Sequence, residues 1–262
     1  MNELHDTSDH QGATDGGGAL PLLVITGAAG RIGTFYRAHL AQAEPRWRLR
    51  LTDIRDIPDP RGADVVTGNF ADLPFACSVL EGADALLHLA ADPSPSADYY
   101  ASLLERNVTA AYNAFEAAAR AKIRRHVFAS SVNAINGYPE DLQVHASMLA
   151  RPGNVYGATK VWGEALAAAY AAQGRLSTIC VRIGGIPRPG ERPRPEHPRT
   201  LAIFVTERDL CHLFDCCLRV GGIDFAVVHG QSANRFTRME IETTRRLVGY
   251  EPQDDVFAIA EG

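Results

Sequence analysis

The amino-acid sequence predicts an α/β fold, namely a doubly wound parallel sheet with a small C-terminal portion packed beside it. Short apolar segments alternate along the chain with longer segments that are rich in alanine or have polar residues on one side. This alternation is typical of strands and helices that follow one another and build a parallel sheet. The first apolar segment, residues 22–25, is continuous, as in a strand that helices cover on both faces. A glycine-rich turn separates it from the first helix, which is the second mark of this fold.

The remaining elements follow from the same patterns. Short runs rich in apolar or β-branched residues predict strands, at residues 22–25, 48–52, 65–66, 85–89, 126–130, 177–182 and 225–229. Apolar residues at helical spacing predict helices, at residues 31–43, 99–121, 157–173, 207–218 and 239–247. No repeat of the solenoid type is present.

Two segments fit no regular element. Residues 1–19 are polar and lack both the basic start and the apolar centre of a signal peptide, so we expect a disordered tail. Residues 187–199 are rich in proline and arginine, which excludes a helix or a strand. The second segment is either an exposed, stiff loop or a lid over a binding site.

Composition excludes several classes of protein. A net charge of −5 gives no electrostatic reason to expect nucleic acid or an anionic membrane as a partner. The apolar runs are too short to span a membrane. Five cysteines without zinc-like spacing predict reduced thiols, no bound metal and a cytoplasmic location.

A dinucleotide site is predicted at residues 26–33. Gly27 permits the tight turn, Gly30 lets the backbone approach a pyrophosphate, and Gly33 lets the helix pack against the sheet. Asp53 ends the next strand, 20 residues after Gly33, where a carboxylate accepts hydrogen bonds from ribose hydroxyls. This acid favours NAD over NADP, although Arg55 lies close enough to attract a 2′-phosphate.

Tyr156 and Lys160 form the candidate reactive pair. They stand four residues apart at the start of a predicted helix and therefore share a face. A nearby ammonium lowers the pKa of a phenol, which then serves as a general base for a hydroxyl or a general acid for a carbonyl. The alternative is a half-buried tyrosine with a lysine whose head reaches solvent. Lysine is scarce here: only Lys122 and Lys160 occur among 26 basic residues, which favours a chemical role for one of them.

Ser130 and Ser131 end the fifth predicted strand, at the sheet edge where doubly wound folds present groups to ligands. Ser131 is the better candidate to hydrogen-bond a reacting oxygen. The alternative is a simple turn at the end of the strand.

Together these motifs resemble the extended short-chain dehydrogenase/reductase superfamily, in its NAD-dependent epimerase/dehydratase group. The resemblance covers residues 20–184 and rests on the segments 26–33, 88–91, 130–131 and 156–160 together with Asp53 and Asn107. Within that group, residues 181–184, 199–202 and 249–252 resemble those of uronate dehydrogenases. We therefore expect an NAD-binding domain of the Rossmann type at 20–184 and a small substrate-binding portion at 185–262.

The resemblance implies roles for individual residues. It assigns catalysis to Tyr156, Lys160 and Ser131. It assigns cofactor binding to the glycine turn, the acid and the strand ends, namely Gly27, Ala29, Gly30, Arg31, Ile32, Gly33, Asp53, Asn69, Phe70, Leu89, Ala90, Ala91, Asn107, Tyr156 and Lys160. It assigns substrate binding to Ser131, Val132, Asn133, Gly185 and Arg199.

Three departures from the family pattern bear on these roles. Asn69 stands where the superfamily usually has aspartate near the adenine. Val132-Asn133 stands where uronate dehydrogenases have Asn-His, which help to hold the sugar. Arg199 matches the arginine that grips the uronate carboxylate, but the preceding loop is longer than usual. Arg194 or Arg192 are therefore alternatives, and a further alternative is that all three arginines are surface charges without a binding role.

The resulting hypothesis is an NAD-dependent oxidoreductase that oxidises the hemiacetal hydroxyl of a sugar, a uronate or a related aldose, to a lactone. The alternative is a nucleotide-sugar epimerase or dehydratase with tightly bound NAD, for which the 102 residues after Lys160 are few. A non-catalytic dinucleotide sensor is a third class, against which the intact Tyr, Lys and Ser set argues. By analogy with the superfamily, a homodimer or higher homo-oligomer is expected.

Overall fold

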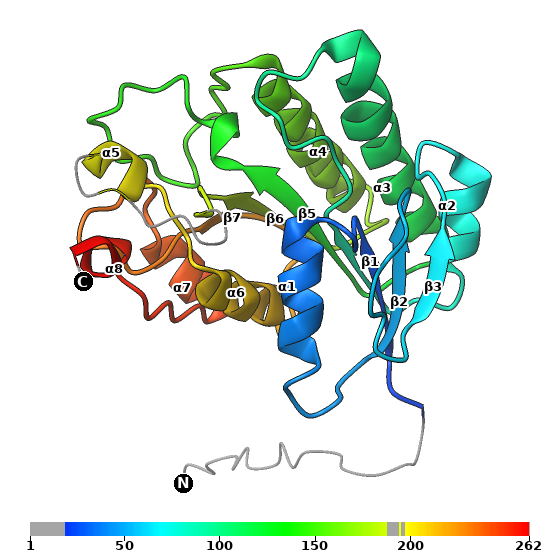
Figure 1. Cartoon of the computed structure of the whole chain (residues 1–262). Helices are drawn as coiled ribbons and strands as arrows, with labels where there is room; N and C mark the ends of the chain where they lie inside the picture. The colour runs from blue at the N-terminus through cyan, green and yellow to red at the C-terminus, as the bar shows by residue number, and fades with distance from the viewer. Residues whose placement is uncertain (1–18, 188–193, 195–196, 262) are drawn as a thin grey trace, which may run out of the picture.

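The computed structural model describes residues 19–187, 194 and 197–261. In this part of the chain seven parallel strands form one sheet in the order β3-β2-β1-β4-β5-β6-β7 (Figure 1). The strands are β1 (Leu22–Thr26), β2 (Arg48–Asp53), β3 (Asp64–Thr67), β4 (Ala85–His88), β5 (Arg125–Ser131), β6 (Thr178–Ile183) and β7 (Phe225–Gly230). The chain runs outward from β1 to β3 and then from β4 to β7, so the switch in direction lies between β1 and β4. The predicted doubly wound parallel sheet is confirmed.

Helices cover both faces of the sheet. The α-helices are α1 (Arg31–Leu40), α2 (Leu73–Leu80), α3 (Ala110–Arg120), α4 (Val155–Ala172), α5 (Pro198–Leu201), α6 (Glu207–Arg219), α7 (Glu242–Val248) and α8 (Val256–Glu261). A π-helical segment η1 (Tyr99–Thr109) leads into α3, and a short 3-10 turn η2 (Val132–Ala134) follows β5. Helices α1, α6 and α7 lie on one side of the sheet, and α2, α3 and α4 lie on the other (Figure 1).

Each face of the sheet has its own apolar core. The first core joins Tyr36 of α1 to Phe214 of α6, whose rings meet edge to face at 5.4 Å. The second core joins Phe115 of α3 to Phe128 of β5 at 5.6 Å between ring centroids. Burial of apolar surface on both faces explains why the central strands β1 and β4 are almost wholly apolar, whereas β2, nearer the edge, alternates arginine and leucine.

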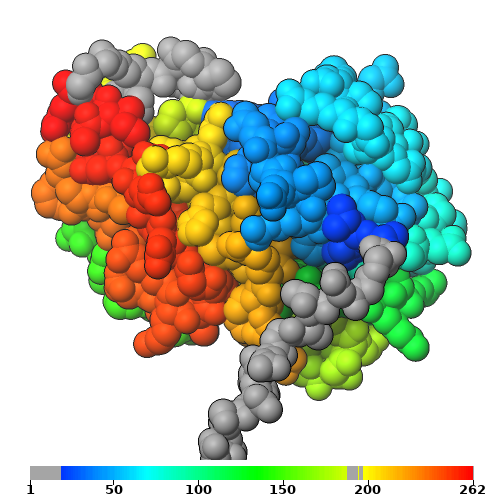
Figure 2. Space-filling view, turned by 90° about the horizontal axis from the view of Figure 1, so that it is seen from below, coloured from blue at the N-terminus to red at the C-terminus, as the bar shows by residue number. Residues whose placement is uncertain are grey.

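The C-terminal segment contributes to this same sheet. Strand β7 pairs with β6, and α6 packs against α1 through a hydrogen bond from the Tyr36 hydroxyl to Asp215 of 2.8 Å. Figure 2 shows the yellow and orange surface of α6 between the blue N-terminal segments and the red C-terminal one. The segment 185–262 therefore extends the sheet as well as adding the small helices α5, α7 and α8.

All the strands and most helices match the sequence-based predictions within a few residues. The predicted helix at 99–121 is instead the π-helical η1 followed by α3. Helix α2 was not predicted, because its eight residues are too few to show a period and include Pro74. Helix α8 was not predicted either. Helix α7 ends at Gly249, whose φ of 70° is the left-handed conformation that glycine adopts without strain.

The two segments without predicted structure are described only in part. The predicted disordered tail lies outside the described residues, apart from Ala19. In the segment 187–199 the structure describes Pro187, Arg194 and 197–199, and α5 begins at Pro198.

No helix among the described residues is long and apolar enough to cross a membrane. No group of His, Cys, Asp and Glu side chains in the described part of the chain has the arrangement of a metal site.

His126 lies in the second core with neither ring nitrogen hydrogen-bonded to a described residue. It is fully buried, and burial lowers its pKa from 6.5 to about 3. An unsatisfied buried polar group costs about 1–3 kcal/mol. We therefore expect His126→Leu to raise the free energy of unfolding by about that amount at pH 7.

The pH dependence of stability tests whether burial of the His126 ring is the cause of this difference. Between pH 6.5 and 3 the unfolded histidine binds a proton that the folded one does not, so the wild type loses stability as the pH falls through this window. His126→Leu removes this contribution, and its advantage in urea unfolding should be larger at pH 5 than at pH 7. Equal stability of the two proteins at both pH values would contradict the prediction.

Candidate functional site

The turn after β1 leaves no room for side chains at its glycines. Gly27 has a φ of 66°, and a Cβ there would lie 2.7 Å from the backbone nitrogen of Ala90. A Cβ at Gly33 would lie 2.6 Å from the carbonyl oxygen of Gly27. The first helix therefore starts close to the sheet, and its free N–H groups face the space beyond β1.

Asp53 ends β2 beside this turn, as predicted. Its side chain is buried, and its two carboxylate oxygens accept hydrogen bonds from the backbone nitrogens of Ala29 (3.0 Å) and Arg55 (3.1 Å). The Arg55 guanidinium lies 3.3 Å from the same carboxylate and is largely exposed. Ala29 thus acts on Asp53 through its backbone and does not itself line the cavity described below.

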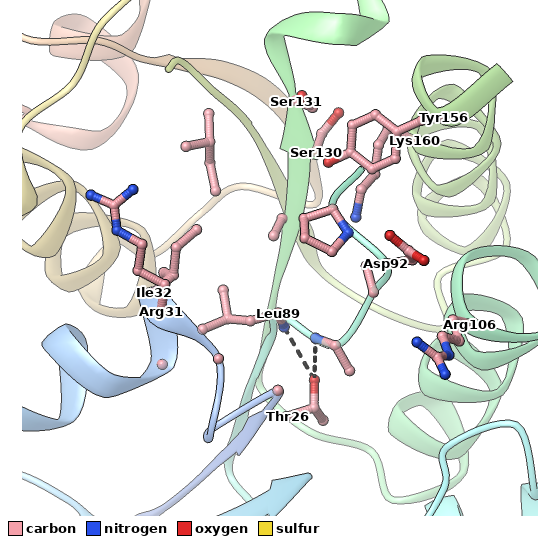
Figure 3. A pocket seen from close by; sticks show the side chains of 18 of the residues that line it. Thr26, Arg31, Ile32, Leu89, Asp92, Arg106, Ser130, Ser131, Tyr156 and Lys160 are labelled. Atoms are coloured by element: carbon pink, nitrogen blue, oxygen red, sulfur yellow. Dashed lines mark hydrogen bonds between the residues drawn. The ribbon is translucent and has the colours of Figure 1, made fainter. Parts of the chain in front are cut away.

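The segment after β4 is held against β1 by Thr26. The Thr26 hydroxyl oxygen accepts hydrogen bonds from the backbone nitrogens of Leu89 and Ala90, both at 3.1 Å (Figure 3). It also lies 2.9 Å from Nδ1 of His88. Burial lowers the pKa of this histidine well below 6.5. His88 is therefore neutral and supports the strand ends from behind.

Asn107 fixes the next part of the same segment. Its side chain accepts a hydrogen bond from the Asp92 nitrogen at 2.8 Å and donates one to the Asp92 carbonyl at 3.0 Å. It also donates to Thr159, whose hydroxyl bonds the carbonyl of Tyr156 at 2.7 Å. Asn107 is buried outside the cavity lining, so in this structure it connects the segment to the helix that carries Tyr156.

Helix α4 presents the reactive pair. Asn154 caps the helix by accepting a hydrogen bond from Gly157 at 2.7 Å, which sets Tyr156 in the first turn. Lys160 lies one turn further on the same face, with its nitrogen 5.7 Å from the centre of the Tyr156 ring. Ser131 comes from the end of β5, and its oxygen accepts a hydrogen bond from the Asn133 nitrogen at 3.1 Å. Figure 3 shows Ser131, Tyr156 and Lys160 gathered at one end of the pocket.

The titration of this pair differs from the expectation. Burial raises the pKa of Tyr156 above 10.0, and the charge of Asp92 adds to the rise, while hydrogen bonding with Ser131 opposes it. Burial also lowers the pKa of Lys160 to about 8. The ammonium stands near the ring rather than bonded to the phenol oxygen, so burial outweighs the expected stabilisation of the phenolate.

One cavity of about 1190 Å³ runs along these groups. Its lining includes nearly all the residues predicted from the sequence, namely Gly27, Gly30, Arg31, Ile32, Gly33, Asp53, Asn69, Phe70, Leu89, Ala90, Ala91, Ser131, Val132, Asn133, Tyr156, Lys160 and Gly185. The exceptions are Ala29, Asn107 and Arg199. The fold therefore brings the predicted cofactor and reactive residues to one space.

Arg199 is not brought to the cavity. It lies in the short helix α5, its side chain is 78% exposed, and it pairs with Glu140. Leu201 of the same helix is buried instead, so the helix turns Arg199 to solvent. Of the two alternatives, Arg194 is exposed and Arg192 lies outside the described residues.

The sequence reasoning missed several residues of the cavity. They include Ile54, Asp92, Pro93, Pro95, Arg106, Asn136, Ile186 and Ile203. Most follow a strand or precede a recognised motif, for example Asp92 directly after Ala91 and Arg106 before Asn107. Their position just after a strand is the one signal in the sequence by which they could have been found, because they share no recognisable residue pattern.

The fold and this cavity define a dinucleotide-binding protein of the doubly wound class. The family model described as "NAD dependent epimerase/dehydratase family" matches residues 23–208. A glucose-6-phosphate dehydrogenase of Haloferax volcanii, described as NAD-dependent, is 31% identical over 89% of this chain and 93% of its own. A uronate dehydrogenase of Pseudomonas putida is 31% identical over 88% of this chain and 84% of its own.

Solved structures of similar proteins agree with this family assignment. A mutant uronate dehydrogenase from Agrobacterium tumefaciens, complexed with NAD, superposes with a TM-score of 0.82 at 29% identity, over 93% of this chain and 88% of that one. The chain belongs to the NAD-dependent epimerase/dehydratase family. The resemblance inferred from the motifs is thereby confirmed, and the sugar dehydrogenases among these relatives favour the dehydrogenase hypothesis over the epimerase one.

Proposed function

We propose that this protein oxidises the hemiacetal hydroxyl of a sugar, a uronate or a related aldose, to a lactone, with NAD as the hydride acceptor. The observation that carries the proposal is the shared cavity, which joins Ser131, Tyr156 and Lys160 to the glycine turn and Asp53. The sugar dehydrogenases among the relatives support the same reaction class.

The residues present fit a dinucleotide. Glycine at positions 27 and 33, where a Cβ would collide with the chain's own backbone, keeps the turn tight and the first helix against the sheet, which brings the helix N-terminus to the pyrophosphate position. The buried carboxylate of Asp53 suits the hydroxyls of the adenosine ribose, and the guanidinium of Arg55 beside it could also attract the 2′-phosphate of NADP. Ala90, Ala91 and Lys160 would line the nicotinamide-ribose side. When bound, NAD supplies the hydride acceptor.

The chain supplies binding and proton transfer. Ser131 would hydrogen-bond the reacting hydroxyl and hold it towards Tyr156. Tyr156 would then accept the hydroxyl proton as the C–H hydrogen leaves the same carbon as hydride, so that the carbon and oxygen form the lactone carbonyl. Tyr156 acts as the base in its phenolate form, which burial disfavours. Lys160, with a pKa of about 8, is protonated at neutral pH, and its positive charge near the Tyr156 ring stabilises that phenolate until it takes the proton.

We propose that residues 20–184 bind the cofactor and that 185–262 complete the substrate side. Gly185, Ile186 and Ile203 from the later segment line the cavity together with Val132 and Asn133. For Arg199 to bind the carboxylate of a uronate, its side chain would have to leave Glu140 and turn towards the cavity.

NADH formation tests the proposed reaction. The wild type is assayed at 340 nm with NAD and NADP in parallel, against uronic acids, neutral aldoses, sugar phosphates and nucleotide sugars. Net NADH production with a free sugar supports the dehydrogenase. Tightly bound NAD with no net reduction on any of them would overturn it and favour the epimerase or dehydratase.

We also propose a homodimer in the cytoplasm. All five cysteines are free, as in a reducing compartment. Tyr112 of α3 and Trp162 of α4 are both more than 40% exposed on adjacent helices, and a second copy of this face would cover them. Light scattering after size exclusion should give a dimer for the wild type and a monomer for Trp162→Glu; a monomeric wild type would contradict the proposal.

A further inference from the structure

Asp92 places a carboxylate on the cavity wall beside the reactive pair. It follows Ala90 and Ala91 on the segment after β4 and lines the same cavity. Figure 3 shows it below Tyr156 and Lys160, with Arg106 further along that wall. Its charge acts on Tyr156, whose pKa it helps to raise.

The carboxylate is held in one position by hydrogen bonds from its own segment and from η1. Oδ2 accepts a hydrogen bond from the Ser102 hydroxyl at 2.5 Å, and Oδ1 accepts one from the Ser94 nitrogen at 3.0 Å. The Asp92 backbone is fixed by Asn107 at 2.8 Å. Because a carboxylate has about four acceptor sites, each oxygen can accept another hydrogen bond.

These contacts keep Asp92 ionised. The Ser102 hydrogen bond lowers its pKa most, and the Ser94 nitrogen and the Arg106 charge add to this against the effect of burial. An ionised carboxylate only accepts hydrogen bonds, so it suits a hydroxyl and repels a carboxylate or phosphate. Val132, which also lines the cavity, offers no polar side chain to a sugar.

We propose that Asp92 is a specificity-determining residue that accepts a hydrogen bond from the sugar hydroxyl next to the reacting carbon. The substrate is therefore an aldose or uronate with a free hydroxyl at C2, and an anionic substituent at that carbon is excluded. This inference rests on the proposed function, because it takes Tyr156 to mark the reacting oxygen. Asp92 lines the same cavity as Tyr156 on the adjoining wall (Figure 3), and the hydroxyl next to the reacting carbon is the nearest other donor on the ring.

Paired sugars test this role. We compare D-glucose with 2-deoxy-D-glucose and D-galactose with 2-deoxy-D-galactose, measuring kcat/KM by NADH formation. The wild type should prefer the parent sugar by about 10- to 100-fold, the range for a hydrogen bond to a charged group. Asp92→Ala should reduce that preference to less than threefold, mainly by loss of rate with the parent sugar. NAD binding, measured by quenching of protein fluorescence, should not change.

Two further variants separate specificity from folding. Asp92→Asn keeps the shape of the side chain, its Oδ1 still accepts from the Ser94 nitrogen, and its amide nitrogen can donate to the Ser102 oxygen once that hydroxyl turns. It therefore tests the role of Asp92 if Asp92→Ala does not fold, and its preference for the parent sugar should fall at least threefold. Asp98→Asn is the matched control, because Asp98 caps η1 through the Ala101 nitrogen at 2.7 Å and does not line the cavity. Its preference should equal that of the wild type.

The outcomes are distinct. If the wild type oxidises no sugar, the proposed function fails. If it oxidises the parent sugars but Asp92→Asn and Asp92→Ala keep the full preference over the 2-deoxy forms, the function stands and the role of Asp92 is overturned.

Discussion

Tyr156→Phe should lower the rate of NADH formation by about 10³-fold, the middle of the range for a general acid–base group. The change removes the hydroxyl that would accept the substrate proton and leaves the ring, which is 7% exposed, in its packing. The affinity for NAD should stay within about threefold, because the glycine turn and Asp53 are untouched. Steady-state kinetics and equilibrium binding of NAD measure the two effects separately.

The same helix provides a control. Tyr170 lies on α4, and its hydroxyl donates a hydrogen bond to Glu116 at 2.7 Å, outside the cavity. Tyr170→Phe therefore removes the same atom and should cost about 1 kcal/mol of stability with little loss of rate. A Tyr156→Phe enzyme that keeps more than a tenth of the wild-type rate would exclude Tyr156 as the base.

Glu164→Gln should destabilise the fold by about 3–5 kcal/mol, the range for breaking a buried ion pair. Glu164 of α4 accepts hydrogen bonds at 2.8 Å from Nε and from a terminal nitrogen of Arg182 on β6. It also accepts one from the Ser130 hydroxyl at 2.6 Å. Both charged side chains are less than 10% exposed, so the amide would leave the guanidinium charge buried without a counterion. Urea unfolding of the two proteins at pH 7 measures the difference.

An exposed pair serves as the comparison. Glu242 and Arg245 of α7 lie 3.2 Å apart and are 74% and 41% exposed. Glu242→Gln should cost less than about 1 kcal/mol, because water screens the pair. Replacing both buried partners, as Glu164→Leu with Arg182→Met, should recover much of the loss. Equal effects of Glu164→Gln and Glu242→Gln would contradict this account of the buried pair.

Most of the residues that line the cavity could be predicted because they are closely spaced along the chain. Gly27 and Gly33 lie in one turn, and Tyr156 and Lys160 lie in one turn of a helix, so the sequence itself places them together. The apolar strands predicted the sheet in the same way. The resemblance to a known family added roles that spacing alone does not give.

The predictions that were wrong, the location of Arg199 and the direction of the Tyr156 pKa shift, concern properties that depend on contacts between distant segments. Arg199 matched a family position, but the orientation of α5 gives it Glu140 as a partner, 59 residues away. The pKa of Tyr156 rises because the fold buries it and brings Asp92 near, neither of which its own helix reveals. The ion pair of Arg182 in β6 likewise depends on the tertiary structure, because only the packing of α4 on the sheet supplies its counterion.

The sequence by itself therefore determined the doubly wound sheet, the dinucleotide turn and the Tyr156–Lys160 pair, since each is encoded by residues within one or two elements. Only the tertiary structure decided that Asp92 lines the cavity and that Arg199 faces solvent. The physical reason is that burial and the local electric field depend on every element packed around a group, and chain order does not specify those neighbours.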